Sequence, residues 1–202
     1  MKKLSFTLAF GLAILLANAQ QLGFSFSRGA TMVHSNNEFA AAPINQGYAA
    51  SAYLVRLLPY DFKLTSGIQF SQLYTGGAVK NATNQLTGIP ESFCYFELPV
   101  VFEKDFYIIP KEGKKATFLR LGAGLSLAYD HNNVQQQIVR GKAPSNSSDL
   151  DYGSHLSLQW VKPVTLKSEI AMGLHAKSNT TSSDNAPFIS FIGAKIDLRF
   201  IN

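Results

Sequence analysis

The sequence is poor in cysteine and lacks long apolar runs. Its one cysteine, Cys94, cannot form an internal disulfide, which excludes the small disulfide-stapled folds of secreted proteins. After residue 20, no unbroken apolar run approaches the roughly 20 residues that a membrane-spanning helix needs. A helical membrane protein is therefore excluded, and the chain can reside in a membrane only as a β-barrel or as a peripheral body.

Charged residues are also few, at 15% of the chain, and they form one tight basic cluster at Lys111, Lys114 and Lys115. This cluster has no interleaved aromatic residues and belongs to no recognisable nucleic-acid-binding module. The four histidines lie in separate segments without the spacing of metal ligands. We therefore expect no nucleic-acid partner, no metal and no cofactor.

The first 19 residues have the features of a secretory signal peptide. Lys2 and Lys3 precede an apolar run over residues 4–16, and the small-x-small pattern of a cleavage site follows at Ala17-Asn18-Ala19. The apolar run is too short to span a membrane as a helix. We predict that residues 1–19 are removed on export and that residues 20–202 form a single domain.

From Leu22 onward, apolar and polar residues alternate with a period of two, which indicates β-strands. The last segment is the clearest, because one of its faces is apolar and the other carries Lys195, Asp197 and Arg199. The same division predicts eight strands, at residues 22–34, 47–58, 62–74, 89–103, 119–130, 150–160, 164–176 and 188–200.

The connections alternate between long and short. The long polar ones are 35–46, 75–88, 131–149 and 177–186, the short ones are 59–61 and 162–163, and 104–115 is intermediate. Outer-membrane barrels have short periplasmic turns and longer extracellular loops. Soluble lipocalin-like barrels and sandwiches share the alternation, but typical globular strands are only about 5–6 residues long. We therefore predict an all-β fold, an eight-stranded antiparallel up-and-down transmembrane β-barrel in the bacterial outer membrane.

Such a barrel turns its apolar faces toward lipid and its charges inward. Because eight strands enclose a space only wide enough for side chains, we expect a packed lumen rather than a wide pore. The residues predicted to form this lumenal charged network are Lys63, Glu97, Arg120, Lys167, Glu169, Lys195, Asp197 and Arg199.

Two residues disagree with the simple alternation. Arg28 shares a face with Phe24 and Phe26, where a charge near the middle of the bilayer would cost roughly 2–4 kcal/mol. We therefore expect a bulge near Gly29 that turns Arg28 inward. Pro99 lies inside a predicted strand although it donates no ladder hydrogen bond, which favours an edge or a bulge there.

Three strand segments resemble a known family. Residues 95–101 (YFELPVV), 119–124 (LRLGAG) and 193–200 (GAKIDLRF) are similar to the PorT-like outer-membrane β-barrel domain family. The resemblance extends over most of the mature chain. It implies the barrel fold and the outer-membrane location, and it implies no single activity because the functions of its members vary.

The leading functional hypothesis is a noncatalytic outer-membrane protein with a structural or surface-interaction role. Its expected partners are outer-membrane lipid and, through the four long loops, other envelope proteins or extracellular ligands. One alternative is a narrow channel for ions or small solutes. The other is a lipid A-modifying hydrolase, because His155, Ser157 and the downstream Glu169 resemble the histidine, serine and glutamate of outer-membrane lipid A deacylases.

Overall fold

The chain forms a closed barrel of eight antiparallel strands in the order β1-β10-β9-β8-β7-β6-β3-β2. This computed structural model describes residues 20–34, 45–74, 78–80, 86–88, 92–108, 116–130, 150–180 and 188–201. The strands of the barrel are β1 (Gln21–His34), β2 (Asn45–Leu57), β3 (Phe62–Tyr74), β6 (Ser92–Ile108), β7 (Thr117–Asp130), β8 (Leu150–Thr165), β9 (Ser168–Thr180) and β10 (Phe188–Ile201). The predicted eight-stranded up-and-down barrel is confirmed.

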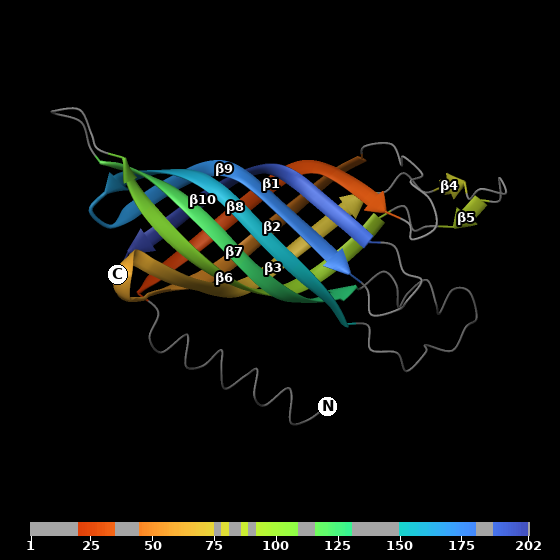
Figure 1. Cartoon of the computed structure of the whole chain (residues 1–202), viewed down its shortest axis with the longest axis horizontal. Helices are drawn as coiled ribbons and strands as arrows, with labels where there is room; N and C mark the ends of the chain where they lie inside the picture. Colours follow the sequence, from red (N-terminus) through yellow and green to blue (C-terminus); the bar gives the residue numbers. More distant parts are fainter. Residues whose placement is uncertain are drawn as a thin grey trace, which may run out of the picture.

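Two smaller elements lie outside the barrel wall. A single 3-10 turn, η1 (Pro59–Asp61), joins β2 to β3, and β4 (Ala78–Lys80) pairs with β5 (Leu86–Gly88) in a two-stranded ribbon between β3 and β6. Figure 1 shows this ribbon beyond one end of the barrel, opposite the end at which the chain terminates. No helix in the described part of the chain is long and apolar enough to cross a membrane.

Side chains alternate between the two faces of the wall along every strand, because successive residues of a strand point to opposite sides. The outward face is apolar, as shown by Phe26, Ala50, Ile68, Phe102, Leu125, Leu156, Leu174 and Ile196, one from each strand. The inward face is polar, with buried Ser27, Lys63, Gln69, Glu97, Arg120, Gln159, Asn179 and Arg199. This distribution is the reverse of that in a soluble protein, where apolar side chains fill the core.

Several strand boundaries differ from the predicted ones. The turn between β8 and β9 lies at residues 166–167 and not at 162–163, because β8 continues through Pro163 to Thr165. A register shift between Pro163 and Thr165 accommodates the proline, which cannot donate a ladder hydrogen bond.

Three connections are likewise shorter than predicted. Residues 45–46 belong to β2, residues 177–180 belong to β9, and β6 extends to Ile108. The ribbon of β4 and β5 lies within the segment predicted as the loop 75–88. The predicted signal peptide, residues 1–19, lies outside the described residues and stays a prediction.

The bulge expected near Gly29 was a wrong prediction. β1 and β10 pair without a register shift from Gln21 to His34, so Arg28 stays on the outward face. There its guanidinium donates to Gln46 Oε1 at 2.6 Å, close to the loop end of β2. The physical reason is the polar partner that Gln46 of the neighbouring strand supplies on the outward face.

Pro99 lies at an interruption in the β3–β6 ladder. The interruption accommodates the missing N–H group of proline. Paired residues run from Phe62 to Ser66 and again from Gln69 to Tyr74, and the register is the same on both sides of the gap. Pro99 faces the gap from β6. The wall therefore tolerates the proline by omitting hydrogen bonds locally, without a bulge.

The seam between the first and last strands is tight at one level, as the wall also is at Gly67, Gly124 and Gly173. Gly29 pairs with Gly193, and a Cβ atom built on Gly29 would lie 2.1 Å from the carbonyl oxygen of Ile192 and 2.2 Å from the Cα of Gly193. No side chain fits at such a distance. Glycine is required here for backbone approach, not for an unusual dihedral angle.

Gly29→Ala is expected to destabilise the barrel by about 1–3 kcal/mol, because the added methyl group must push the two closing strands apart. Urea unfolding of the refolded protein, combined with its migration on a denaturing gel before and after boiling, measures the loss. The matched control is Ala30→Val, which adds volume on the outward face of the same strand and should change stability by less than about 0.5 kcal/mol. Equal stability of Gly29→Ala and wild type would contradict the tight seam.

Candidate functional site

The most distinctive site of the molecule is the charged interior of the barrel. Five lysines and arginines and six carboxylates point inward from the strands: Lys63, Arg120, Lys177, Lys195, Arg199, Glu97, Glu103, Asp105, Asp151, Glu169 and Asp197. The two signs are nearly balanced. Balance is necessary because a buried charge without a partner is strongly destabilising.

Arg120 of β7 organises one half of the network, near the end of the barrel with the short turns. Its Nε and Nη2 donate to both carboxylate oxygens of Asp105, at 2.6 and 2.9 Å. Its Nη2 also lies 2.7 Å from Glu169 in an ion pair that lacks hydrogen-bond alignment. Lys63 Nζ reaches the same Asp105 at 2.8 Å. One fully buried arginine thereby links strands β6, β7 and β9.

Arg199 of β10 links the last strand to the opposite wall. Its two terminal nitrogens donate to the two oxygens of Glu103 at 2.7 and 2.8 Å, in the bidentate geometry that makes such pairs strong. Its Nε donates to the hydroxyl of Tyr53 at 3.0 Å. Asp197, which also accepts from Gln159 at 2.6 Å, lies 3.7 Å from Arg199.

A second cluster surrounds Glu97 of β6, closer to the long loops. Glu97 is ion-paired with Lys177 and accepts from Ser71 at 2.6 Å. His155 Nε2 lies 3.0 Å from Ser126 Oγ and 3.5 Å from Glu97.

The ring of His155 also stacks on the ring of His175, with centroids 5.5 Å apart. Histidines of two neighbouring strands, β8 and β9, therefore extend the Glu97 cluster across the lumen.

An apolar layer covers this cluster on the loop side. It consists of Leu73, Tyr95, Ala128, Ile189 and Phe191, all of them buried. The ring of Phe191 meets the edge of His175 at a centroid distance of 6.0 Å. Along the barrel axis, the lumen is therefore filled first by ion pairs around Arg120 and Arg199, then by the Glu97 cluster and finally by these apolar side chains together with the buried polar residues Thr31, Asp151 and Asn179 at the same level.

Seven of the eight residues predicted for the charged network lie in this interior, and Lys167 does not. Lys167 is exposed in the turn between β8 and β9, so its assignment to the lumen was wrong. The alternation placed it inward only because the register shift after Pro163 was not visible in the sequence.

Sequence reasoning missed four charged members of the network, one of which is Asp151, a buried residue of the predicted strand 150–160. Lys177 was assigned to a loop and Asp105 to a connection, because the predicted strands ended too early. Glu103 was placed on the inward face but was left out of the network. Its bidentate pair with Arg199 joins residues 96 positions apart, and alternation along single strands carries no information on such pairs.

The structure does not assemble His155, Ser157 and Glu169 into a catalytic arrangement. The Nδ1 of His155 faces His175 at 3.2 Å and its Nε2 faces Ser126, while Glu169 pairs with Arg120. Ser157 instead points toward Gly122 of the paired strand β7. Among the residues described, no group of three or more histidine, cysteine, aspartate or glutamate side chains is arranged to hold a metal ion.

Comparisons with known proteins support the fold. No protein-family model and no curated protein sequence matches the chain. Among solved structures, Neisserial surface protein A is similar at a TM-score of 0.51 and 13% identity, over 88% of this chain and 96% of that chain. This likeness supports the barrel fold, whereas the resemblance to the PorT-like family stays a prediction.

Two further solved structures align over most of the chain with lower scores. The attachment invasion locus protein Ail of Yersinia pestis aligns at a TM-score of 0.39 and 14% identity, over 90% of this chain and 99% of that chain. An outer membrane channel from Pseudomonas putida F1 aligns at a TM-score of 0.28 and 11% identity, over 91% and 95%.

Replacing Arg199 by alanine is expected to destabilise the protein by about 3–5 kcal/mol, because Glu103 then stays buried without its bidentate partner. Equilibrium unfolding in urea measures the effect. Lys167→Ala, which removes an exposed lysine from a turn, should change stability by less than about 0.5 kcal/mol. An Arg199→Ala protein as stable as the control would show that the interior pairs contribute nothing to folding.

Proposed function

We propose that the chain is a small, noncatalytic barrel of the bacterial outer membrane, with a closed lumen and a structural or surface-contact role. The observation that carries the proposal is the inverted wall, with apolar side chains outward and ion pairs inward. In hydrocarbon, every backbone polar group needs an internal partner, and a closed barrel supplies one without exposing a strand edge. The wall described above is closed, and its ladders are continuous apart from the gap opposite Pro99 and the register shift after Pro163.

Outward aromatic residues support the membrane setting. They lie near both ends of the barrel, as expected for girdles at the two lipid–water interfaces. Toward the loops these are Tyr74, Phe96, Tyr129 and Tyr152, and toward the short turns they are Phe62, Phe106, Trp160 and Phe200.

The two ends of the barrel differ in a way that supports surface contact. The turns 58–61 and 166–167 are short, and the connection 109–116 at the same end is of intermediate length, whereas the opposite end carries the long connections 35–44 and 131–149 and the ribbon of β4 and β5. In outer-membrane barrels the long connections face the exterior. We assign them the contacts with other envelope proteins or extracellular ligands.

The packed interior favours this role over the two alternatives. Arg120 and Arg199 are 0% exposed and lie across the lumen, and the apolar layer covers the other side of the Glu97 cluster. A conducting path for ions would need a continuous polar opening past both layers. The separation of His155, Ser157 and Glu169 likewise gives no support to the hydrolase.

Leu174→Arg tests the membrane setting directly. Leu174 is the middle residue of β9 and is 59% exposed on the outward face. If lipid surrounds the wall, arginine at this site should cost about 2–4 kcal/mol for folding into lipid vesicles. Leu166→Arg is the matched control, because Leu166 lies in the 166–167 turn at 98% exposure. This variant should lose almost none of its folding free energy. Equal stability of the two variants would favour a water-exposed wall and overturn the proposal.

Wild-type protein in planar lipid bilayers is expected to show no discrete conductance steps, because ion pairs and apolar side chains fill the lumen. Recording at several voltages on protein whose insertion has been verified by the gel shift provides the measurement. Reproducible steps that change in size on replacement of Arg120 would instead support the narrow channel.

A further inference from the structure

Among the strand side chains that the structure describes, the outward face of the barrel carries charge of only one sign. The charged residues on this face are Arg28, Arg56, Lys104 and Lys162. In contrast, each strand carboxylate whose side chain the structure describes points into the lumen. The outer wall of the described strands thus offers cations without any protein carboxylate to neutralise them.

Three of these four cations lie toward the end of the barrel with the short turns. Arg56 is next to the last residue of β2, Lys104 is near the end of β6, and Lys162 is near the end of β8. Arg28 lies near the middle of β1, where its guanidinium already donates to Gln46. A ligand of negative charge is therefore expected at the short-turn end, which is the periplasmic side in the proposed orientation.

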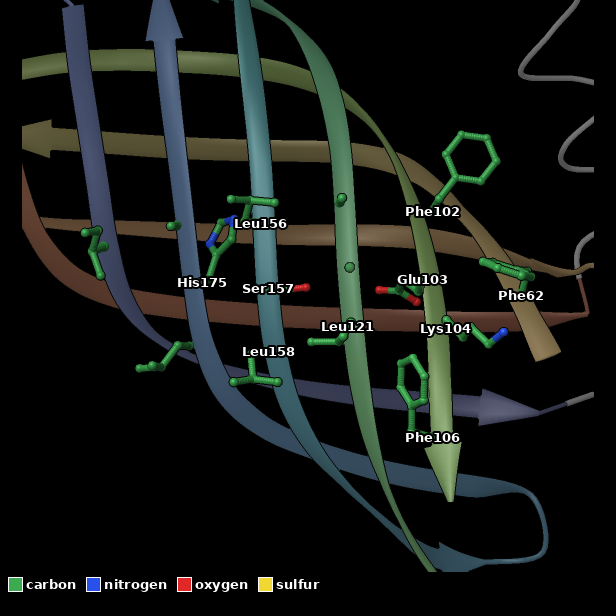
Figure 2. A pocket seen from close by; sticks show the side chains of 15 residues that line it. Phe62, Phe102, Glu103, Lys104, Phe106, Leu121, Leu156, Ser157, Leu158 and His175 are labelled. Atoms are coloured by element: carbon green, nitrogen blue, oxygen red, sulfur yellow. The ribbon is translucent and has the colours of Figure 1, made fainter. Parts of the chain in front are cut away.

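Lys104 stands at one end of a groove on the outward face (Figure 2). Its ammonium lies 4.4 Å from the ring centre of Phe62 and 5.8 Å from that of Phe106. The groove has a volume of about 670 Å³, and the small residue Ala123 recesses the wall between the larger side chains of Phe102 and Leu156. The groove combines one cation with an apolar lining.

Lys162 lines a second groove of the same character, with a volume of about 860 Å³. Its apolar lining includes Trp160 and Val164 of β8 and Ile170 and Met172 of β9. The register shift after Pro163 lies at the same place. Two separate grooves thus place a lysine beside an apolar surface at the same end of the barrel.

We propose that these two grooves bind anionic phospholipids of the periplasmic leaflet, with the phosphate at Lys104 or Lys162 and an acyl chain along the apolar lining. The inference rests on the membrane setting proposed above. A lysine extends its apolar stem along the wall while its ammonium reaches the interface, where a lipid phosphate supplies the missing counter-charge. The apolar grooves then distinguish a lipid from a free phosphate ion.

Trp160 provides a built-in probe, because it is the only tryptophan of the chain and lines the Lys162 groove. The protein is refolded into vesicles in which brominated phosphatidylglycerol or brominated phosphatidylcholine replaces part of the lipid. Bromine quenches tryptophan fluorescence on contact. We expect the anionic lipid to quench Trp160 at a lower mole fraction than the zwitterionic lipid, and Lys162→Gln to reduce this preference by about fivefold.

Lys167→Gln is the matched control, because it removes an equal charge from the adjacent turn and leaves the groove intact. It should retain the preference. For the other groove, the double variant Trp160→Phe with Phe106→Trp moves the probe beside Lys104, and Lys104→Gln should then abolish the preference that this probe reports.

The outcomes separate the inference from the proposed function. Equal quenching by both lipids in the wild type would overturn the proposed lipid sites. An equal loss of the preference for anionic lipid in Lys162→Gln and Lys167→Gln would do the same. Neither result would contradict the membrane setting. Absence of quenching by either lipid, in protein shown to be folded by its gel shift, would overturn the membrane setting itself.

Discussion

Closure of the backbone hydrogen-bond circuit between β1 and β10 is the constraint on which the rest of the structure depends. A sheet of eight strands in an apolar solvent has no means of satisfying two open edges, so its first and last strands must meet. The unbroken pairing from Gln21 to His34 achieves this, and the Gly29–Gly193 approach shows how closely the two backbones come together. Closure also fixes the diameter, and with it the space that the inward side chains must fill.

That limited space explains the chemistry of the interior. Apolar side chains are committed to the outer wall, so alternation leaves polar residues for the inside, and their charges have to neutralise one another at close range. Arginine suits this task because its planar guanidinium makes several directed hydrogen bonds at once, as Arg120 and Arg199 do. The lumen therefore functions as the core of the protein, although its chemistry is that of a surface.

The sequence was sufficient to predict the fold class, the strand number and most of the inward charges, because a period of two survives in strands as long as these. It was insufficient where the pattern depends on a neighbouring strand. Because of the register shift after Pro163, Lys167 lies in a turn. Arg28 lies on the outer face, where it contacts Gln46. The pairing of Glu103 with Arg199 follows from closure, and the separation of His155 from Glu169 follows from the register of β8 and β9, in which Glu169 lies opposite Pro163; no single strand encodes either.

The position of Arg199 on the last strand has a consequence for biogenesis. Its partners Glu103 and Tyr53 precede it by 96 and 146 residues, so neither contact exists until the final strand has been added. A barrel arrested before that step holds Glu103 without its bidentate partner, in addition to two open edges. Each partial assembly is therefore destabilised both by its open strand edges and by its incomplete ion pair. The wall and its ionic core are completed together in one cooperative final step.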